Sequence, residues 1–370
     1  MRSCAFAVQW GILYDCNLRL RQLRWPLPPM TLKMMFPQAP AFGTPTEIQP
    51  GVWWIRMPLP FALNHINLWL LEDGEGYTLV DTGVATPEVK AHWETICREF
   101  LENKPITRVI CTHTHPDHIG MAGLLCEQYQ APLWMTAAEY LMGRVLTADL
   151  PGVQREDLVR FFEQHGLQAE KSEETGMARG GMFKRLVSEM PSAYRRISEG
   201  DDIAIGNHTW RVHVGFGHSP EHASLICESL GLMISGDMLL PKISTNVSVF
   251  GSEPEGNPLR QFLDSVKRMQ TFSDNLWVLP SHGLPFAGIA ERTQALLDHH
   301  EERLSVLWEG IEGEVSARDS IPLIFNRELD SHQLSFAIGE AIAHLHYLMY
   351  EGRLCKRIDE AGIVRFRRIC

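Results

Sequence analysis

The sequence predicts an α/β protein in which two β-sheets face each other and helices cover their outer sides. The chain has 370 residues, of which 45% are hydrophobic and 21% charged, so it can bury a large core. Short β-rich runs alternate with segments of helical periodicity. These elements form two similar halves, and each half closes on a loop that carries histidine. Together the observations indicate a layered αββα sandwich.

The first half contains four β-rich runs and one helix. The runs are 51–58, 66–73, 77–83 and 108–113, and turn residues separate them. The letters EGYT predict a hairpin between the second and third runs. Segment 87–101 has apolar residues at helical spacing, with Pro87 near its start. We expect it to be a helix that crosses between the third and fourth strands.

The second half repeats this pattern. Its β-rich runs are 201–206, 208–217, 223–229, 230–239 and 276–283, and a helix is expected over about 258–272. If the two sheets face each other, the histidine loops of both halves meet at one edge. The domain prediction is therefore an N-terminal extension over 1–43, expected to be disordered, a main domain over 44–288 and a C-terminal domain over 289–370.

Composition excludes several classes of protein. The formal net charge of -11 argues against a protein that coats nucleic acid. The eight cysteines form no C-x-x-C pair, so neither a thiolate zinc site nor a disulfide framework is indicated. No apolar run reaches the roughly 18 residues of a membrane span. We expect a globular protein of the reducing cytoplasm without a membrane partner.

One short stretch carries most of the chemical information. The segment ICTHTHPDHIGMAG, residues 110–123, places His113, His115, Asp117 and His118 within six positions. A tight loop after a strand can direct His113 and His115 to one metal and Asp117 and His118 to a second. Nitrogen and carboxylate ligands without thiolate suit Zn²⁺, with Mn²⁺ or Fe²⁺ as alternatives.

This stretch resembles the signature of the metallo-β-lactamase superfamily of hydrolases. Four further motifs follow the family's order: LVDTG with Asp81, GFGHSPEH with His218, ISGDML with Asp237 and LPSHG with His282. The resemblance extends over about 48–288. It implies that Asp81 supports the metal loop and that the fold is the αββα sandwich of this family.

The resemblance also implies a ligand set for two metal ions. It assigns His113, His115 and His218 to the first metal, Asp117, His118 and His282 to the second, and Asp237 to a bridging position. Two neighbouring cations lower the pKa of a shared water and polarise a carbonyl or phosphoryl oxygen, so hydrolysis is expected. Asp117 is also expected to act as the catalytic acid and base. The expected cofactor is two Zn²⁺ ions.

Two residues reduce the number of branches of this superfamily that the sequence resembles. True β-lactamases of this fold carry other residues at the position of Asp237, so antibiotic hydrolysis is disfavoured. The flavodiiron relatives carry a carboxylate at the position of His115, so oxygen reduction by iron is disfavoured too. The glyoxalase II, acyl-thioesterase, lactonase and RNase Z-like branches remain, and an iron-dependent sulfur dioxygenase stays open.

An insertion of unusual length separates His118 from His218. Residues 143–197 show apolar positions at helical spacing, among them Phe161 and Phe162, around a glycine-rich joint. We interpret the insertion as a helical hairpin that forms a lid over the site. The alternative is an element that only packs or forms a homodimer.

The tail predicts a helix over about 290–310, followed from Ser331 by helix, helix and a hairpin around 361–362. This order resembles a small winged-helix module. The letters AHLHYLMYEGRL are similar to the C-terminal segment of the β-lactamase-like endoribonuclease branch. Residues 351–370 hold six Lys or Arg against three acids. We expect packing or dimerisation before nucleic-acid binding for this module.

The sequence therefore favours a binuclear hydrolase of a small thioester or related ester, such as an acyl-CoA or a glutathione thioester. The apolar residues of the insertion favour an acyl chain in the pocket. An endonuclease for single-stranded RNA is the alternative from another class, supported by the tail and opposed by the acidic charge balance. A lactonase or a sulfur dioxygenase is the third alternative.

Overall fold

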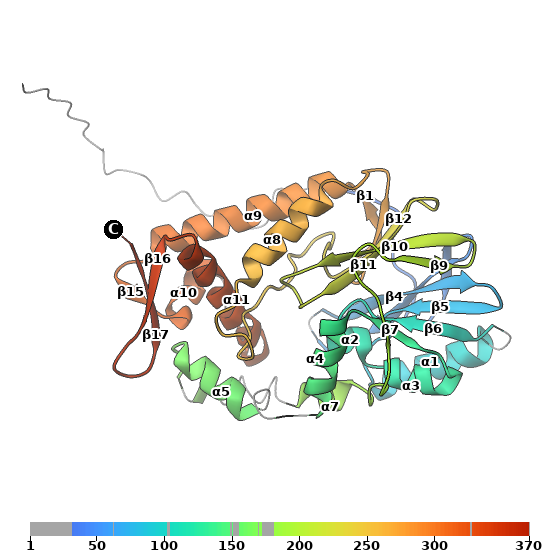
Figure 1. Cartoon of the computed structure of the whole chain (residues 1–370), viewed down its shortest axis with the longest axis horizontal. Coiled ribbons are helices and arrows are strands. Elements are labelled where there is room, and N and C mark those ends of the chain that lie inside the picture. The colour runs from blue at the N-terminus through green and yellow to red at the C-terminus, as the bar shows by residue number, and fades with distance from the viewer. Residues whose placement is uncertain are drawn as a thin grey trace, which may run out of the picture. The chain divides into compact units, whose positions relative to one another are not determined.

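The computed structural model describes residues 32–61, 63–101, 104–148, 150, 155–168, 170–171, 181–325 and 328–369. Within this part of the chain, two seven-stranded sheets face each other and helices lie on their outer sides (Figure 1). The predicted αββα sandwich is therefore confirmed. A separate three-stranded sheet lies near the C-terminus.

The first sheet is built from the first half of the chain. In spatial order it contains β2 (Thr46–Gln49), β3 (Val52–Pro58), β4 (His65–Asp73), β5 (Gly76–Val80), β6 (Ile106–Ile110), β7 (Leu133–Met135) and β8 (Arg195–Arg196). Strands β2 to β5 are antiparallel, and β5 to β8 are parallel. The predicted hairpin joins β4 and β5, with Asp73 opposite Gly76.

The second sheet is built mainly from the second half. Its order is β1 (Lys33–Met34), β14 (Phe286–Ala287), β13 (Trp277–Pro280), β12 (Leu232–Gly236), β11 (His222–Cys227), β10 (His208–Gly215) and β9 (Asp202–Ile205). Only β12 and β13 pair in parallel among these described strands. In each sheet, four antiparallel strands are followed by a parallel pairing, that of β5 with β6 in the first and that of β12 with β13 in the second.

The N-terminal extension differs from the prediction where it is described. Residues 1–31 lie outside the described part of the chain. Residues 32–43 are not a separate tail, because Lys33 pairs with Ala287 and Met34 with Phe286 at the edge of the second sheet. Backbone pairing with β14, whose edge would otherwise be open, explains why this short segment is ordered.

The helices follow the predicted pattern on both outer faces. They are α1 (Pro87–Glu99), α2 (Pro116–Ile119), α3 (Ala122–Tyr129), α4 (Ala137–Ala148), α5 (Arg155–Gln164), α7 (Met182–Leu186), α8 (Pro258–Met269), α9 (Ile289–Gly310), α10 (Ala317–Ile324) and α11 (Ser331–Tyr350). Helices α1 and α3 lie beside the first sheet and α8 beside the second (Figure 1). The Thr86 side chain caps α1, and Pro87 stands in its first turn, where the missing N–H costs no hydrogen bond.

Alternating side chains of the first sheet fill two separate cores. Trp54 of β3 and Trp69 of β4 point between the two sheets, where they stack with ring centroids 5.9 Å apart. Ile55 and Leu68, their neighbours in sequence, point to the opposite side and join the core under α1 and α3. Both faces of this sheet are buried, which explains its nearly continuous apolar runs.

The two helices of the insertion do not form the predicted helical hairpin. Helix α5 turns toward the C-terminal part of the chain, where the N–H of Arg318 donates to the carbonyl of His165 over 3.1 Å. Helix α7 instead contacts α2 and α4 beside the first sheet. The periodicity correctly predicts both helices, but they lie against different parts of the molecule (Figure 1).

The C-terminal part also differs from the prediction in one element. Ser331–Tyr350 forms one continuous helix, α11, where two helices were expected. The hairpin around 361–362 is present as β16 (Leu354–Ile358) and β17 (Val364–Arg368), and β15 (Glu314–Val315) pairs with β17. A capping box of Asp330 and Gln333 stabilises the start of α11.

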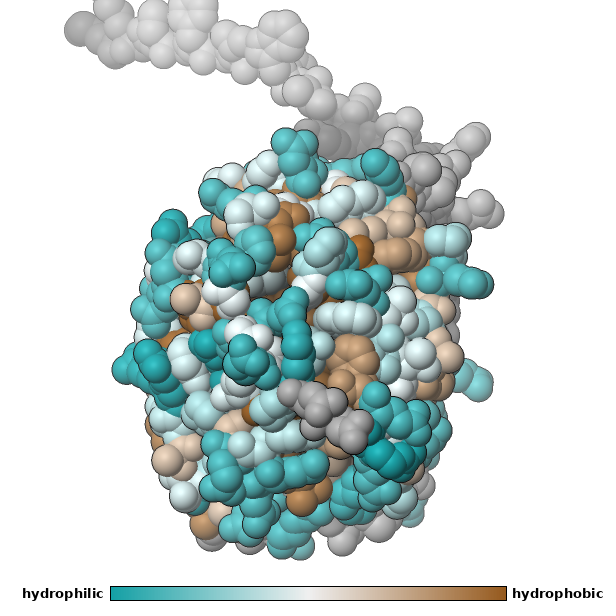
Figure 2. Space-filling view, turned by 90° about the vertical axis from the view of Figure 1, so that its right-hand side faces the viewer, coloured by the Kyte–Doolittle hydropathy of each residue, from teal (hydrophilic) through white to brown (hydrophobic). Residues whose placement is uncertain are grey.

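One face of the molecule is mostly hydrophilic (Figure 2). On the face shown in Figure 2, hydrophilic residues predominate and hydrophobic ones gather only in small, separate areas. No membrane-crossing candidate occurs among the helices in the described part of the chain.

Candidate metal centre

The loop between β6 and α3 brings four candidate ligands to the edge of the sheets. His113 and His115 lie in the loop after β6, and Asp117 and His118 lie on the short helix α2. Pro116 occupies the first turn of α2, and the preceding His115 has an extended backbone, with φ -64° and ψ 149°. This break in direction separates the first two side chains from the next two.

The other three candidates come from loops of the second sheet. His218 follows β10, Asp237 follows β12 directly, and His282 follows β13. The structure thus brings together all seven side chains selected from the sequence. They form two groups, one of His113, His115, His218 and Asp237, the other of Asp117, His118 and His282.

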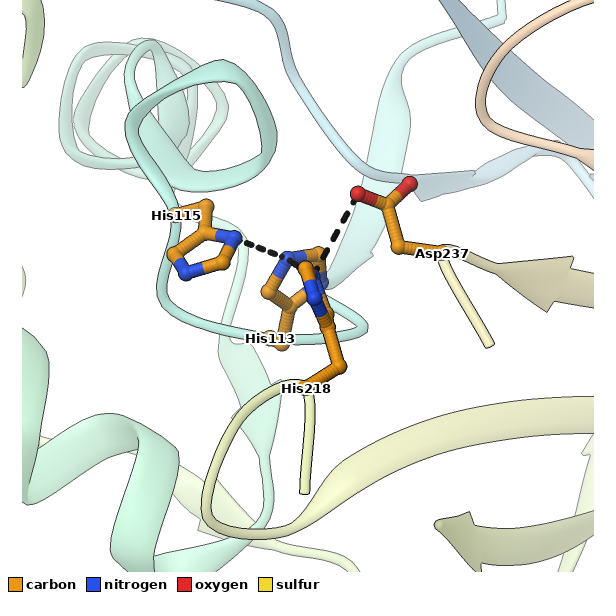
Figure 3. A group of neighbouring side chains, drawn as sticks. All are labelled: His113, His115, His218 and Asp237. Atoms are coloured by element: carbon orange, nitrogen blue, oxygen red, sulfur yellow. Dashed lines mark hydrogen bonds and ion pairs between the residues drawn. The ribbon is translucent and has the colours of Figure 1, made fainter. Parts of the chain in front are cut away.

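The first group converges on one point. His113, His115, His218 and Asp237 point toward one another from three different loops (Figure 3). Nε2 of His113 lies 2.9 Å from Nδ1 of His115 and 3.1 Å from Nε2 of His218. Ring nitrogens at such distances cannot all carry protons, so several lone pairs face a common centre.

Asp237 lies between the two groups. Its Oδ2 is 3.4 Å from Nε2 of His218 in the first group. Its Oδ1 is 3.4 Å from Nε2 of His282 and 3.6 Å from Nε2 of His118 in the second. One carboxylate therefore faces both sets of nitrogens, as a bridging ligand must.

Outer hydrogen bonds fix the ring orientation of three histidines. Nδ1 of His118 donates to Oδ2 of Asp81 over 2.8 Å, and Nδ1 of His218 and of His282 each donate to a backbone carbonyl over 2.7 Å. A carboxylate or carbonyl oxygen can only accept, so each Nδ1 carries the proton. Nε2 of each ring is then the nitrogen that faces the centre and is available to bind a metal.

Asp81 holds its position with an unusual backbone. It has φ 60°, in the left-handed region that few residues other than glycine adopt. The carboxylate also accepts the N–H of Thr112 over 2.8 Å, directly before His113. Strain of this kind persists where surrounding contacts enforce it, often at functional sites. The role expected for Asp81 as a support of the metal loop matches these contacts.

Unpartnered buried atoms test whether a metal fits. Nε2 of His118 and Oδ1 of Asp237 are buried without a hydrogen-bond partner. A buried polar atom without a partner costs about 1 to 3 kcal/mol. Both atoms face the cluster, so a cation held there would satisfy them. Imidazole nitrogens and carboxylate oxygens without thiolate are a ligand set for Zn²⁺, Mn²⁺ or Fe²⁺.

The electrostatics of the cluster also favour a cation. Burial and the neighbouring histidines hold the pKa of His113 well below its ordinary value and that of His115 at about 3. These rings stay neutral and keep a lone pair for a metal. Burial acts in the same direction on His118, but nearby carboxylates, Asp81 foremost, raise its pKa well above the ordinary value. The same negative charges attract a divalent ion.

His222 is a buried residue that the sequence analysis did not select. Its Nε2 accepts the N–H of Asp237 over 3.0 Å, and its ring lies 4.8 Å from that of His113. The ring is so close to the chain that a Cβ on Gly236, which has φ +54°, would lie 2.3 Å from Nε2. Its signal in the sequence is the second histidine of GHSPEH.

Asn67 is a second missed residue, and it supports the loop of His282. Its Nδ2 donates to the carbonyls of Pro280 and Gly283, each over 2.8 Å, and its Oδ1 accepts from the indole of Trp54. It is fully buried. An asparagine inside the apolar run 66–71 was the available signal.

Glu139, the third missed residue, joins two ligand loops. Its carboxylate accepts the N–H of Thr114 over 2.9 Å and that of Glu221 over 2.8 Å. Thr114 stands between His113 and His115, and Glu221 follows His218. Burial raises the pKa of Glu139, although these backbone donors oppose the shift. The first turn of α4 therefore holds the two loops in a fixed relation.

A cavity of about 900 Å³ opens onto the cluster. His115, Asp117, His218, Asp237 and His282 line one part of it. Apolar side chains from the insertion, the 240–258 segment and α11 line the rest, among them Leu158, Phe161, Phe183, Val249, Phe250 and Phe336. The volume is in the range of sites that enclose a small molecule.

The histidines and carboxylates at the loop edge of two facing sheets place this protein in the class of metal-dependent hydrolases. The chain belongs to the metallo-β-lactamase superfamily, whose sequence pattern matches residues 63–282. A second family, described as the metallo-β-lactamase-like C-terminal domain, matches residues 305–369. Homologues in this superfamily are metal-dependent hydrolases that bind divalent metals, typically zinc or iron.

Solved structures and a related sequence agree with this assignment. A β-lactamase domain protein from Burkholderia ambifaria is 43% identical, with a TM-score of 0.83, over 91% of this chain and 97% of that one. A metallo-β-lactamase family protein from Thermus thermophilus is 27% identical, with a TM-score of 0.72, over 87% and 100%. A probable metallo-hydrolase of Bacillus subtilis (strain 168) is 24% identical over 67% of this chain and 76% of its own length.

Proposed function

We propose that the protein hydrolyses a thioester or related ester of an apolar acyl group, such as an acyl-CoA or a glutathione thioester. The observation that carries this proposal is the cavity, in which candidate metal ligands and apolar walls share one space. An acyl chain gains about 0.8 kcal/mol for each methylene that such walls bury. The polar floor then receives the carbonyl and the leaving group.

The proposed ligands are those selected from the sequence. His113, His115 and His218 would hold one cation, Asp117, His118 and His282 would hold the other, and Asp237 faces both groups, with Zn²⁺ as the expected metal. When bound, the two cations supply a water nucleophile near neutral pH and polarise the scissile carbonyl.

Asp117 is the proposed acid and base. Its carboxylate lines the cavity, and Oδ2 lies 3.4 Å from Nε2 of His282. In hydrolysis, the water oxygen bonds to the acyl carbon, the carbon–sulfur bond breaks and the thiolate leaves. Asp117 takes the proton from the water and returns it to the departing sulfur.

The C-terminal hairpin supports the small-molecule proposal over an RNA endonuclease. Five of the six basic side chains in residues 351–370 have partners within the protein: Arg357 with Glu314, Arg365 with Asp319 and Asp359, Lys356 with Glu255, and Arg353 and Arg368 against the ring of Trp308. Arg367 is exposed. Cations neutralised in this way offer little to a phosphate backbone.

A substrate panel tests the proposal. Purified protein is assayed with acyl-CoA thioesters of several chain lengths, a glutathione thioester, a lactone, a glutathione persulfide and labelled single-stranded RNA. We expect the highest kcat/KM for a thioester, and loss of activity after chelation that added Zn²⁺ restores. Cleavage of RNA without thioester hydrolysis would overturn the proposal, as would oxygen consumption with the persulfide alone.

A further inference from the structure

Arg292, at the start of helix α9, is a fully buried arginine. No carboxylate in the described part of the chain pairs with it, and its Nη1 is buried without a hydrogen-bond partner. Burial of an unpaired charge is costly, and a leucine or methionine would pack here without that cost. The contacts that its guanidinium does make should therefore account for its position.

Both of these contacts are carbonyls of one irregular loop, residues 237–246. Nε of Arg292 donates to the carbonyl of Leu240 over 2.5 Å, and Nη2 donates to the carbonyl of Ile243 over 2.7 Å. The loop forms no helix or strand, and among the described residues no backbone N–H donates to either carbonyl. The guanidinium thus supplies the donors that secondary structure supplies elsewhere.

The two ends of this loop belong to the metal centre. It begins at Asp237, whose carboxylate faces both groups of candidate ligands. It ends at Asn246, whose carbonyl accepts Nδ1–H of His218 over 2.7 Å. Thr245 ties the ends together, since its Oγ1 donates to the carbonyl of Asp237 over 2.5 Å. A shift in the middle of a loop closed in this way changes the position of both ends.

We propose that Arg292 is a positioning residue for the metal centre, because its guanidinium fixes the 237–246 loop and, through it, Asp237 and the carbonyl that orients His218. The residue lies beyond 63–282, the part of the chain that matches the superfamily, so α9 contributes to the centre from outside it. The inference rests on the proposed function in that it takes Asp237 and His218 as metal ligands. Loss of outer partners of this kind typically costs roughly 10- to 100-fold in metal affinity.

The test measures metal binding directly. Zn²⁺ affinity of the metal-free protein is determined by competition with a chromophoric chelator, and the visible absorption of the Co²⁺ form reports ligand geometry. Arg292→Met fills the same space but leaves both carbonyls without a donor, so we expect Zn²⁺ binding about 10-fold weaker or more and a changed Co²⁺ spectrum.

Arg292→Lys covers the case in which the methionine variant folds poorly. It keeps the charge and a stem of similar length, but a compact ammonium cannot reproduce the planar fork that reaches two carbonyls. We expect a smaller loss of Zn²⁺ affinity, about threefold or more, with a changed Co²⁺ spectrum.

A matched control comes from the neighbouring helix α8. Nη2 of Arg268 also donates to a backbone carbonyl, that of Val214, over 2.6 Å. That carbonyl belongs to strand β10, which its pairing with β9 and β11 already fixes. Arg268→Met should therefore leave affinity and spectrum unchanged.

A double variant tests whether Arg292 acts through the loop. Thr245→Val breaks the contact with Asp237 without touching α9, and it should also weaken Zn²⁺ binding. If both residues hold the same loop, Arg292→Lys combined with Thr245→Val loses less affinity than the two single losses multiplied together.

Wild-type affinity and spectrum in Arg292→Lys would overturn the inference, and so would a lower melting temperature with unchanged metal binding. Losses that simply multiply in the double variant would also overturn it, because the two residues would then act independently. A wild-type protein that binds Zn²⁺ but hydrolyses no ester would refute the proposed substrate alone. In that case the metal measurements would still decide the role of Arg292.

Discussion

At the scale of single residues, the centre depends on which ring nitrogen carries the proton. His118, His218 and His282 each donate Nδ1–H to an oxygen outside the cluster, so the Nε2 atoms face inward. The acceptors are a strained aspartate and two backbone carbonyls from distant loops. Because these oxygens cannot donate, they keep a proton on Nδ1 and leave Nε2 as the nitrogen that is available to a metal.

Asp237 is the residue on which both halves of the centre depend. We expect Asp237→Ala to lower kcat/KM by more than the roughly 100-fold upper range of outer-partner changes, because no negative charge would remain between two cations. Elemental analysis of the variant should also show less metal than in the wild type. A single change in the insertion, Phe161→Ala, provides the comparison. Near-wild-type activity in Asp237→Ala would contradict the assignment of Asp237 as a bridging ligand.

At the scale of elements, the insertion forms one wall of the cavity through α5 and α7. Phe161 lines the cavity, and its neighbour Phe162 is buried on another side of α5. Helix α5 is held from the C-terminal part through His165 and Arg318. The wall is therefore supported from outside the metal-binding sheets, which suits an element that shapes a substrate pocket.

This arrangement predicts a change in chain-length preference. Phe161→Ala should raise KM or lower kcat/KM for long acyl chains and spare a short activated ester, since only the long chain depends on apolar walls. Phe162→Ala is the matched control, because it removes an equally large buried ring away from the cavity. Kinetics are compared after metal content and melting temperature are checked. An equal loss for short and long substrates in Phe161→Ala would assign the insertion a structural role.

At the scale of the whole molecule, two sheets and the C-terminal helices meet around one cavity. The candidate ligands come from four loops of the facing sheets, and α11 lines part of the same cavity. A centre assembled from such distant segments should form only in the folded chain.

Elemental analysis gives the simplest check of that assembly. We expect about two divalent transition-metal ions per chain, because the two groups of nitrogens each suit one cation and Asp237 faces both. The protein is dialysed against metal-free buffer before measurement, so that loosely held ions are removed. A reproducible value near one would contradict the binuclear centre.

The buried carboxyl of Glu340 predicts how stability depends on pH. Burial raises its pKa from 4.5 to about 7, against the opposing effects of Arg303 and Asn246. A raised pKa in the folded state favours the protonated form. Its contribution is therefore complete below pH 4.5 and is lost as the pH rises to about 7. Relative to wild type, Glu340→Gln should gain stability over this range and keep the gain at higher pH.

Urea unfolding of both proteins at about pH 5, 6, 7 and 8 measures this difference. The metal-free forms are compared so that metal release does not enter the result. A difference in unfolding free energy that stays constant with pH would show that Glu340 does not titrate in this range.

Local patterns explain why much of this protein could be predicted. Alternating periodicity located the strands of both sheets, and helical periodicity located the helices beside them. Burial of one face of an element places apolar residues at regular spacing along the sequence. The motif of residues 110–123 identified four candidate ligands because they stand within six positions of one another. The remaining three, His218, Asp237 and His282, each end a β-rich run, and their order along the chain matched a known family.

What the sequence determined by itself was therefore the fold class and the seven side chains that gather at one edge. Only the tertiary structure decided which polar residues surround them: His222, Asn67 and Glu139 lie far from most of their partners in sequence. It also decided that α5 and α7 pack on different parts of the molecule and that α11 is a single helix. The physical reason is that periodicity records which face of an element is buried, whereas the identity of the contact across that face depends on how distant segments pack.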